Sequence, residues 1–176
     1  MAVTEGVDPE GDVADGVERR LDPRHISHQQ RVGWITAAFL TGLSFIVAIV
    51  FWASAGFSLA ALMAAAGLWL ALSGFLAWHA QAWPEIAYRH ASYKVDDRGL
   101  EICRGVLWRR IINVPRSRVQ HTDVSQGPLE RTHELGTLVV YTAGTDHARV
   151  DLAGLAHARA LRIREHLLPK GEGDAV

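Results

Sequence analysis

The sequence contains a long stretch without charge. No aspartate, glutamate, lysine or arginine lies between Val32 and Pro84, although these residues make up 21% of the 176-residue chain. Two apolar runs, at about residues 32–52 and 59–78, are each long enough at about 1.5 Å per residue to cross a hydrocarbon core of about 30 Å. Neither run has the polar stripe of a helix in a soluble protein. The pattern therefore predicts a transmembrane helical hairpin rather than a buried helical pair.

Several kinds of chemistry lack the residues that they need. Cys103 is the only cysteine, so no intrachain disulfide can form. There is no P-loop, no dinucleotide-binding glycine pattern and no nucleophile elbow. His121 and Asp123 would project to one side of a strand, but two ligands do not make a metal site. We therefore expect no enzymatic activity, no metal site and no cofactor.

Tryptophans and positive charges predict how the hairpin lies in a bilayer. Trp34 and Trp52 bracket the first run, and Trp78 and Trp83 follow the second, where an indole ring can lie among the headgroups. Trp69 is in mid-span. Arginine or lysine flanks both outer ends of the hairpin, whereas the link ASAGFS is uncharged. By the positive-inside rule, both termini are expected in the cytoplasm.

Small residues recur at helical spacing in both runs. The first set is Ala37, Thr41, Ser44 and Ala48, and the second is Ala60, Ala64, Gly67, Ala71 and Gly74. Spacings that alternate between four and three residues place each set on one stripe, where two helix backbones can approach closely. We expect these stripes, including Ala64, Gly67, Ala71 and Gly74, to pack the two helices together. Oligomerisation is an alternative use of the same stripes.

The parts of the chain outside the hairpin differ in composition. Residues 1–21 are acidic and have no aromatic residue, so a disordered tail is expected there, followed by a juxtamembrane segment within residues 22–84. From Tyr88 the sequence alternates in short strand-like segments, and an amphipathic helix is expected at about residues 153–168. This pattern predicts an antiparallel split barrel over residues 85–169, capped by its C-terminal helix, and a tail at residues 170–176.

The second half of the chain resembles a known family. The segments VDDRGL, RGVLWRR, VPRSRVQH, QGPL and LGTLVV, in this order and spacing, resemble the bacterial pleckstrin-homology (PH) domain of YdbS-like membrane proteins. The resemblance implies an α+β membrane protein, with two transmembrane helices followed by a PH-like barrel at the cytoplasmic face of the bacterial inner membrane. It also implies a larger membrane protein with several such domains as a partner, and it supplies no catalytic residues.

An arginine cluster is the remaining candidate for a binding site. Six arginines but only one acid, Glu101, lie between Arg98 and Arg118. The candidate lipid- or partner-binding residues are Arg104, Trp108, Arg109, Arg110, Arg116 and Arg118. An arginine near an anionic leaflet contributes about 1 kcal/mol of binding free energy. The alternative interpretation is that these arginines form the solvated outer face of the strands. If residues 107–114 form one strand, Arg109 and Arg110 point to opposite faces.

We expect a membrane-anchored, non-enzymatic binding or scaffold module that contacts lipid headgroups, a partner protein or its own copies. The alternative is an accessory subunit of a transport, export or antimicrobial-resistance membrane complex. The lack of ionisable groups in mid-span counts against a transport path. Nucleic acid is not an expected partner, because 14 basic and 12 acidic residues from Glu85 onward leave little net field.

Overall fold

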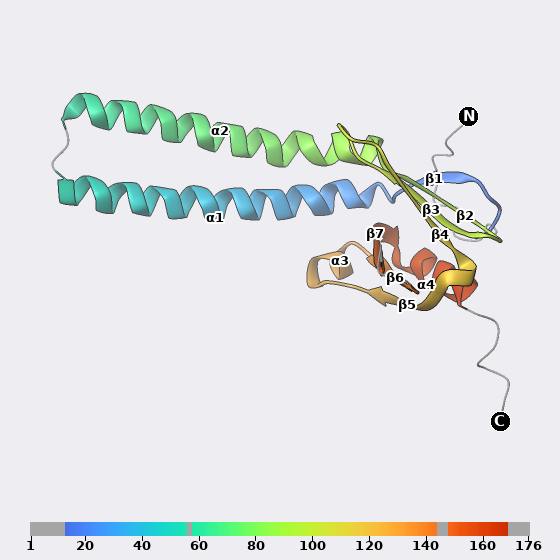
Figure 1. Cartoon of the computed structure of the whole chain (residues 1–176). Coiled ribbons are helices and arrows are strands. Elements are labelled where there is room, and N and C mark those ends of the chain that lie inside the picture. The colour runs from blue at the N-terminus through green and yellow to red at the C-terminus, as the bar shows by residue number, and fades with distance from the viewer. Residues whose placement is uncertain (1–12, 56–57, 144–147, 169–176) are drawn as a thin grey trace. The chain divides into compact units, whose positions relative to one another are not determined.

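The computed structural model describes residues 13–55, 58–143 and 148–168, which form two compact units (Figure 1). One unit combines the chain up to His28 with the chain from Ile86 onward, and the other is Gln29–Glu85. The elements are, in order, β1 (Glu18–Arg20), α1 (Arg24–Ala55), α2 (Leu59–Arg89), β2 (Ser92–Asp96), β3 (Gly99–Arg104), β4 (Arg110–Pro115), the 3-10 helix η1 (Arg116–Arg118), β5 (Val119–Ser125), α3 (Pro128–Thr132), β6 (Leu135–Thr142), β7 (Arg149–Ala156) and α4 (His157–Leu167).

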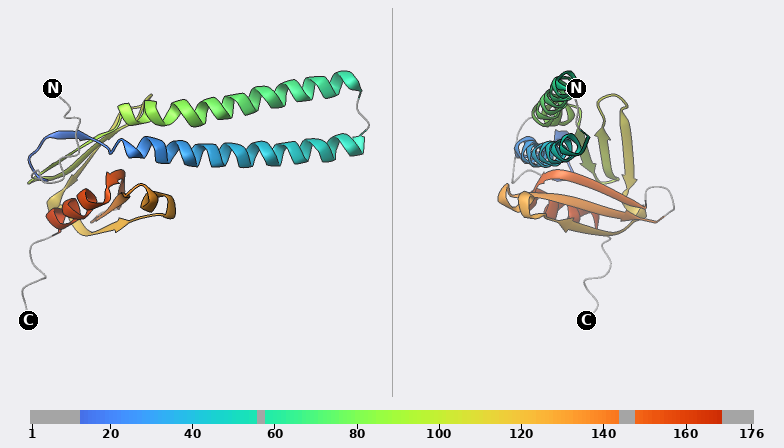
Figure 2. Two further views of the ribbon diagram at one scale, coloured as in Figure 1. Left: turned by 180° about the vertical axis from the view of Figure 1, so that it is seen from behind. Right: turned by 90° about the vertical axis from the view of Figure 1, so that its left-hand side faces the viewer.

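The first unit is a small antiparallel β structure capped by a helix. Its strands form two sheets in the orders β1-β2-β3-β4 and β5-β6-β7, and α4 packs against the second sheet (Figure 2). Because side chains alternate along a strand, Val95, Leu100 and Ile102 of the first sheet point into the core. Leu138 of β6 and Ile163 of α4 complete this core. This α+β, PH-like architecture confirms the predicted fold class.

The prediction of a disordered tail is wrong for residues 13–21. Residues 1–12 lie outside the described residues. Val13 is only 7% exposed and joins the core, and β1 pairs with β2 through Glu18↔Lys94 and Arg20↔Ser92. Sequence composition missed this strand because its stability comes from pairing with residues more than seventy positions away. The helical hairpin is therefore inserted between the first two strands of one sheet, rather than preceding the whole barrel.

Two helical segments, Arg24–Ala53 and Leu59–Arg89, are long and apolar enough to span a membrane. The first predicted small-residue stripe does face α2. Ala37 is buried, and Ser44 accepts a hydrogen bond from Trp69 Nε1 at 3.1 Å. At the base of the hairpin the helices come close, because a Cβ atom on Gly33 would lie 3.1 Å from the Cβ atom of Ala80. Small residues of α1 thus serve helix packing, as predicted.

The second stripe does not pack the hairpin, and this prediction is wrong. Ala64, Gly67, Ala71 and Gly74 are exposed, and Cβ atoms on the two glycines would meet nothing within 4 Å. The side of α2 that meets α1 instead carries other residues, both small and large: Ala61, Leu62, Ala65, Ala66 and Trp69. Trp69 lies on this facing side, where its indole N–H finds a polar partner on α1.

The C-terminal helix begins later than expected. β7 continues to Ala156, and α4 covers His157–Leu167. The sequence pattern extended the helix backward over Gly154, whose φ of +80° lies in the left-handed region and does not continue a helix. The inward face of α4 is formed by Ala160, Ile163 and Leu167, which are fully buried.

Candidate functional site

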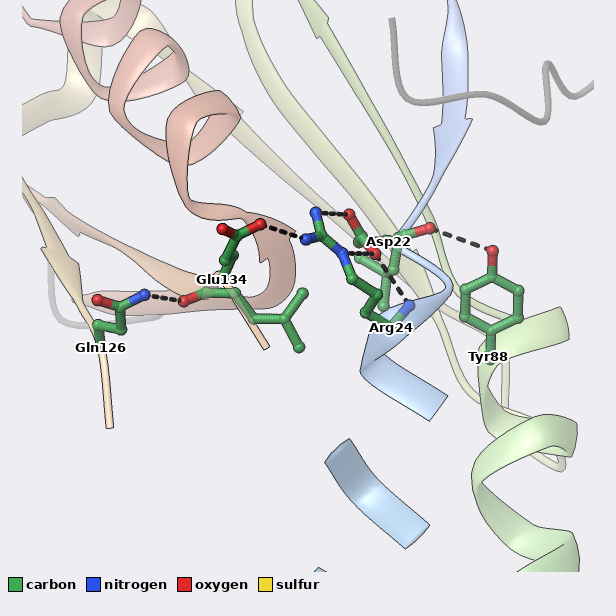
Figure 3. Close-up of polar contacts among 7 residues, drawn as sticks. Asp22, Arg24, Tyr88, Gln126 and Glu134 are labelled. Atoms are coloured by element: carbon green, nitrogen blue, oxygen red, sulfur yellow. Dashed lines mark hydrogen bonds and ion pairs between the residues drawn. The ribbon is translucent and has the colours of Figure 1, made fainter. Parts of the chain in front are cut away.

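A polar cluster fixes the start of α1 to the β domain (Figure 3). Asp22, which is buried, accepts the backbone N–H of Arg24 at 2.9 Å and the Arg24 guanidinium at 3.0 and 3.1 Å. Arg24 also donates to Glu134 at 2.8 Å. The Asp22 N–H donates to the Gly154 carbonyl, and Tyr88 donates to the Leu21 carbonyl. These contacts cap the helix and anchor the segment that leads to the first span.

The QGPLE segment, part of which carries the family resemblance, has a structural role here. Gln126 donates through its side chain to the Leu135 carbonyl at 2.7 Å (Figure 3). Glu130 accepts the Gly127 N–H at 2.7 Å and the Thr137 hydroxyl at 2.8 Å. The polar groups of this motif therefore hold the short helix α3 against β6.

The predicted arginine cluster is divided between the two ends of β4. Arg104, Trp108, Arg109 and Arg110 lie at the tip of the β3–β4 hairpin. Arg116 and Arg118 belong to η1, after the other end of this strand, so about 20 Å of extended chain separates the two groups. Sequence adjacency predicted one cluster because it takes no account of strand length. The structure brings together only the first group.

The hairpin tip combines exposed apolar side chains with positive charge. Leu107 is 82% exposed and Trp108 is 87% exposed, the two highest values among the exposed large hydrophobic residues. Arg104 and Arg110 are directly opposite each other across the two strands, so two like charges are neighbours at the tip. The loop depends on Gly105, whose φ is +118° and whose Cβ atom would clash with the Trp108 carbonyl at 2.1 Å. We name residues 104–110 the hairpin tip.

The two faces of the hairpin are distinct. Ile112 and Val114 are buried, and Arg110 shares their alternation at the outer end of the strand. Arg109 lies over the opposite face, where its Nε donates a hydrogen bond to Cys103 Sγ at 3.0 Å. This hydrogen bond raises the pKa of the Arg109 guanidinium further above its usual range. The opposite orientation of Arg109 and Arg110 was expected only if residues 107–114 formed one strand, whereas β4 begins at Arg110, so strand alternation does not orient Arg109.

Metal ligands do not gather in the part of the chain that the structure describes. No group of three histidine, cysteine, aspartate or glutamate side chains there is placed to hold a metal ion. His121 stacks on Tyr141, with ring centroids 4.1 Å apart, on the outer side of the second sheet. The side chain therefore has a packing role at this position.

These features define a class: a membrane hairpin built into a PH-like domain that exposes a basic and apolar hairpin tip. A family model described as "Bacterial PH domain" matches residues 29–170, and the chain belongs to this family. It is similar to the transmembrane protein YdbS of Bacillus subtilis (strain 168), with 32% identity over 84 residues, or 48% of this chain. The chain spans about half of that relative, 51% of its length, and no solved structure matches. The predicted family resemblance is confirmed.

Proposed function

We propose that the protein is a non-enzymatic binding module, anchored in the inner membrane with both termini in the cytoplasm, whose hairpin tip contacts anionic lipid headgroups. The observation that carries this proposal is the exposure of Leu107 and Trp108 beside three arginines. An indole is suited to the level of the headgroups, because it has an apolar ring and one polar N–H. The arginines provide the attraction to an anionic leaflet.

The hairpin architecture supports a position of this domain beside the bilayer. Strands β1 and β2 pair in the same sheet, so the chain entering the first span and the chain leaving the second lie on one side of the membrane. Only a few residues separate Arg20 from α1, and Arg89 from β2. The β domain therefore remains within a short chain length of the membrane surface, where the hairpin tip can contact headgroups.

A photoreactive residue in place of Leu107 tests the proposal in native membranes. We expect the full chain to form lipid adducts on illumination, and the adducts to decrease when Arg109→Ala and Arg110→Ala are introduced together. The same residue in place of Glu165, which is exposed on α4, is the matched control and should give few adducts. Adducts with protein alone at position 107 would assign the tip to a partner protein or a second copy, and would overturn lipid contact.

A second candidate function is supported by the exposed stripe of α2. Ala64, Gly67, Ala71 and Gly74 leave open space beside the helix backbone, as is typical of a surface on which another membrane helix packs. Such a helix would come from a second copy or from a larger membrane protein with several PH-like domains, and the protein would be an accessory subunit of a transport, export or resistance complex. Native mass spectrometry from membranes tests this assembly. A strictly monomeric chain, unchanged by Gly67→Leu, would remove it.

A further inference from the structure

A pocket opens on the outer face of the four-stranded sheet, and neither Leu107 nor Trp108 lines it. Its volume is about 220 Å³, and the side chains that matter for its chemistry are Arg20, Arg89, Arg109, Glu18, Ser92 and Cys103. A water molecule occupies about 30 Å³ in the liquid, so the pocket has room for a phosphate group with part of a headgroup. Nothing in the family description assigns a ligand to it.

The strand register explains why these residues meet. Arg20 of β1, Ser92 of β2 and Cys103 of β3 are successive partners across the sheet, and they form one row on the face opposite the core. Ser92 and Cys103 supply the floor of the pocket. Arg89, the last residue of α2, and Arg109, which extends back from the hairpin tip, supply further walls. Cys103 is only 8% exposed, although its side chain lies on the outer face of the sheet.

The charge balance of the pocket favours an anion. Three guanidinium groups face one carboxylate, and that carboxylate already accepts a hydrogen bond from Ser92 Oγ to Glu18 Oε1 at 2.6 Å. Arg109 Nε donates to the Cys103 sulfur, which is a weak acceptor. A phosphate oxygen is a much stronger acceptor for arginine and allows two parallel hydrogen bonds. An entering phosphate would therefore improve the contact that Arg109 makes.

The chain also keeps this pocket near the membrane. Arg89 follows Pro84, the last residue of the charge-free stretch, by five positions. Five residues extend over at most about 18 Å, whatever the orientation of the β domain. One wall of the pocket is thus within reach of the phosphates at the bilayer surface.

We propose that this pocket binds a phosphate group, with Arg20, Arg89 and Arg109 as its ligands, and that an anionic phospholipid supplies it. The inference deepens the proposed function and relies on it only for the lipid source. Phosphate recognition by the pocket does not depend on whether the hairpin tip enters the bilayer. The two proposals can therefore fail separately.

Cys103 gives a readout at the site itself, because it lines the pocket and is the only cysteine of the chain. The rate of its alkylation by N-ethylmaleimide is measured by mass spectrometry on the full chain in nanodiscs. Discs of phosphatidylcholine are compared with discs that also contain phosphatidylglycerol. In a parallel arm, the chain in neutral detergent is titrated with inorganic phosphate against chloride at constant ionic strength.

We expect phosphatidylglycerol to slow the alkylation several-fold, and Arg20→Gln together with Arg89→Gln to abolish the protection. Arg98→Gln with Arg131→Gln removes two exposed arginines that do not line the pocket, and should leave the protection intact. Arg20→Lys with Arg89→Lys retains both charges and should restore part of the protection of Cys103. This result would show that the glutamine pair does not act by misfolding the chain.

The outcomes separate the parts of the proposal. Protection by inorganic phosphate but not by phosphatidylglycerol would support the phosphate site and overturn the lipid source. Equal alkylation rates in every condition, or protection that the glutamine pair does not change, would overturn the site. Lipid adducts at position 107 without protection of Cys103 would leave the proposed function standing and overturn this inference.

Discussion

Trp69 donates a hydrogen bond from its indole nitrogen to Ser44 Oγ across the two membrane helices, at a distance of 3.1 Å. Ser44 in turn donates to the Thr41 carbonyl of its own helix at 2.9 Å. The indole N–H would otherwise have no acceptor in mid-span, where no water is available. This bond explains why one tryptophan lies far from the membrane interfaces.

Ser44→Ala should weaken the helical hairpin, because it removes the only acceptor described for this indole. Hydrogen bonds between membrane helices contribute about 0.6 kcal/mol on average and up to about 1.7 kcal/mol. The free energy of unfolding in mixed micelles measures the loss. Thr36→Ala is the control, since Thr36 bonds only within its own helix, to the Val32 carbonyl. If both substitutions lowered the free energy of unfolding equally, the hydrogen bond between the helices would have no stabilising role.

Asp22→Asn should destabilise the β domain more than Glu134→Gln, although both acids bind Arg24. The Asp22 side chain is 3% exposed, whereas that of Glu134 is 80% exposed. A hydrogen bond to a buried charged group contributes about 2 kcal/mol, and an exposed ion pair contributes less than about 1 kcal/mol. Urea unfolding of the full chain, followed by near-ultraviolet circular dichroism, compares the two. A larger loss for Glu134→Gln would contradict the anchoring role of Asp22.

Gly154→Ala should strain the junction between β7 and α4. Gly154 has a φ of +80°, and a Cβ atom there would lie 2.6 Å from the His25 ring. A residue other than glycine in this backbone region costs about 1–3 kcal/mol before any clash is counted. Gly127→Ala is the control, because its nearest neighbour would be Glu130 Oε2 at 3.5 Å. Thermal melting in detergent should show a lower midpoint for Gly154→Ala alone.

The pairing of β1 with β2 can be tested by a disulfide. With Cys103→Ser in place, Glu18→Cys and Lys94→Cys should oxidise readily, because these positions are directly opposite. Glu18→Cys with Glu101→Cys should not form the bond, since Glu101 pairs with Lys94 and is therefore two strands away, at about 10 Å. Peptide mapping by mass spectrometry detects the cross-link. Absence of the first disulfide would place residues 18–20 outside the sheet.

The sequence was most informative where the pattern was local. The charge-free stretch predicted both helices, and the alternation after Ser92 predicted most strands, because burial imposes these patterns residue by residue. β1 could not be predicted in this way, since its three residues become a strand only by pairing with β2. The stripe on α2 misled because small residues recur on more than one side of this helix, and their spacing alone does not show which side faces α1.

The candidate site shows the same division. The sequence identified Arg104, Trp108, Arg109 and Arg110 of the hairpin tip from their charge and their indole, but it did not identify the exposed Leu107. It pointed to Arg109 but could not identify the pocket, whose other residues come from β1, the end of α2, β2 and β3. The signal that would have found the pocket is the strand register, which joins Arg20 to Ser92 and Ser92 to Cys103. Register depends on turns and long-range pairing, which a single sequence specifies weakly.

Because the hairpin is inserted between β1 and β2, the four-stranded sheet can close only when both strands are on the same side of a membrane. If only one of the two helices crossed, β1 and β2 would emerge on opposite sides of the bilayer and the four-stranded sheet could not close. Val13 and the partners of β1 would then remain exposed to water and to proteases. A closed four-stranded sheet is therefore compatible with two crossings between β1 and β2 and incompatible with a single crossing.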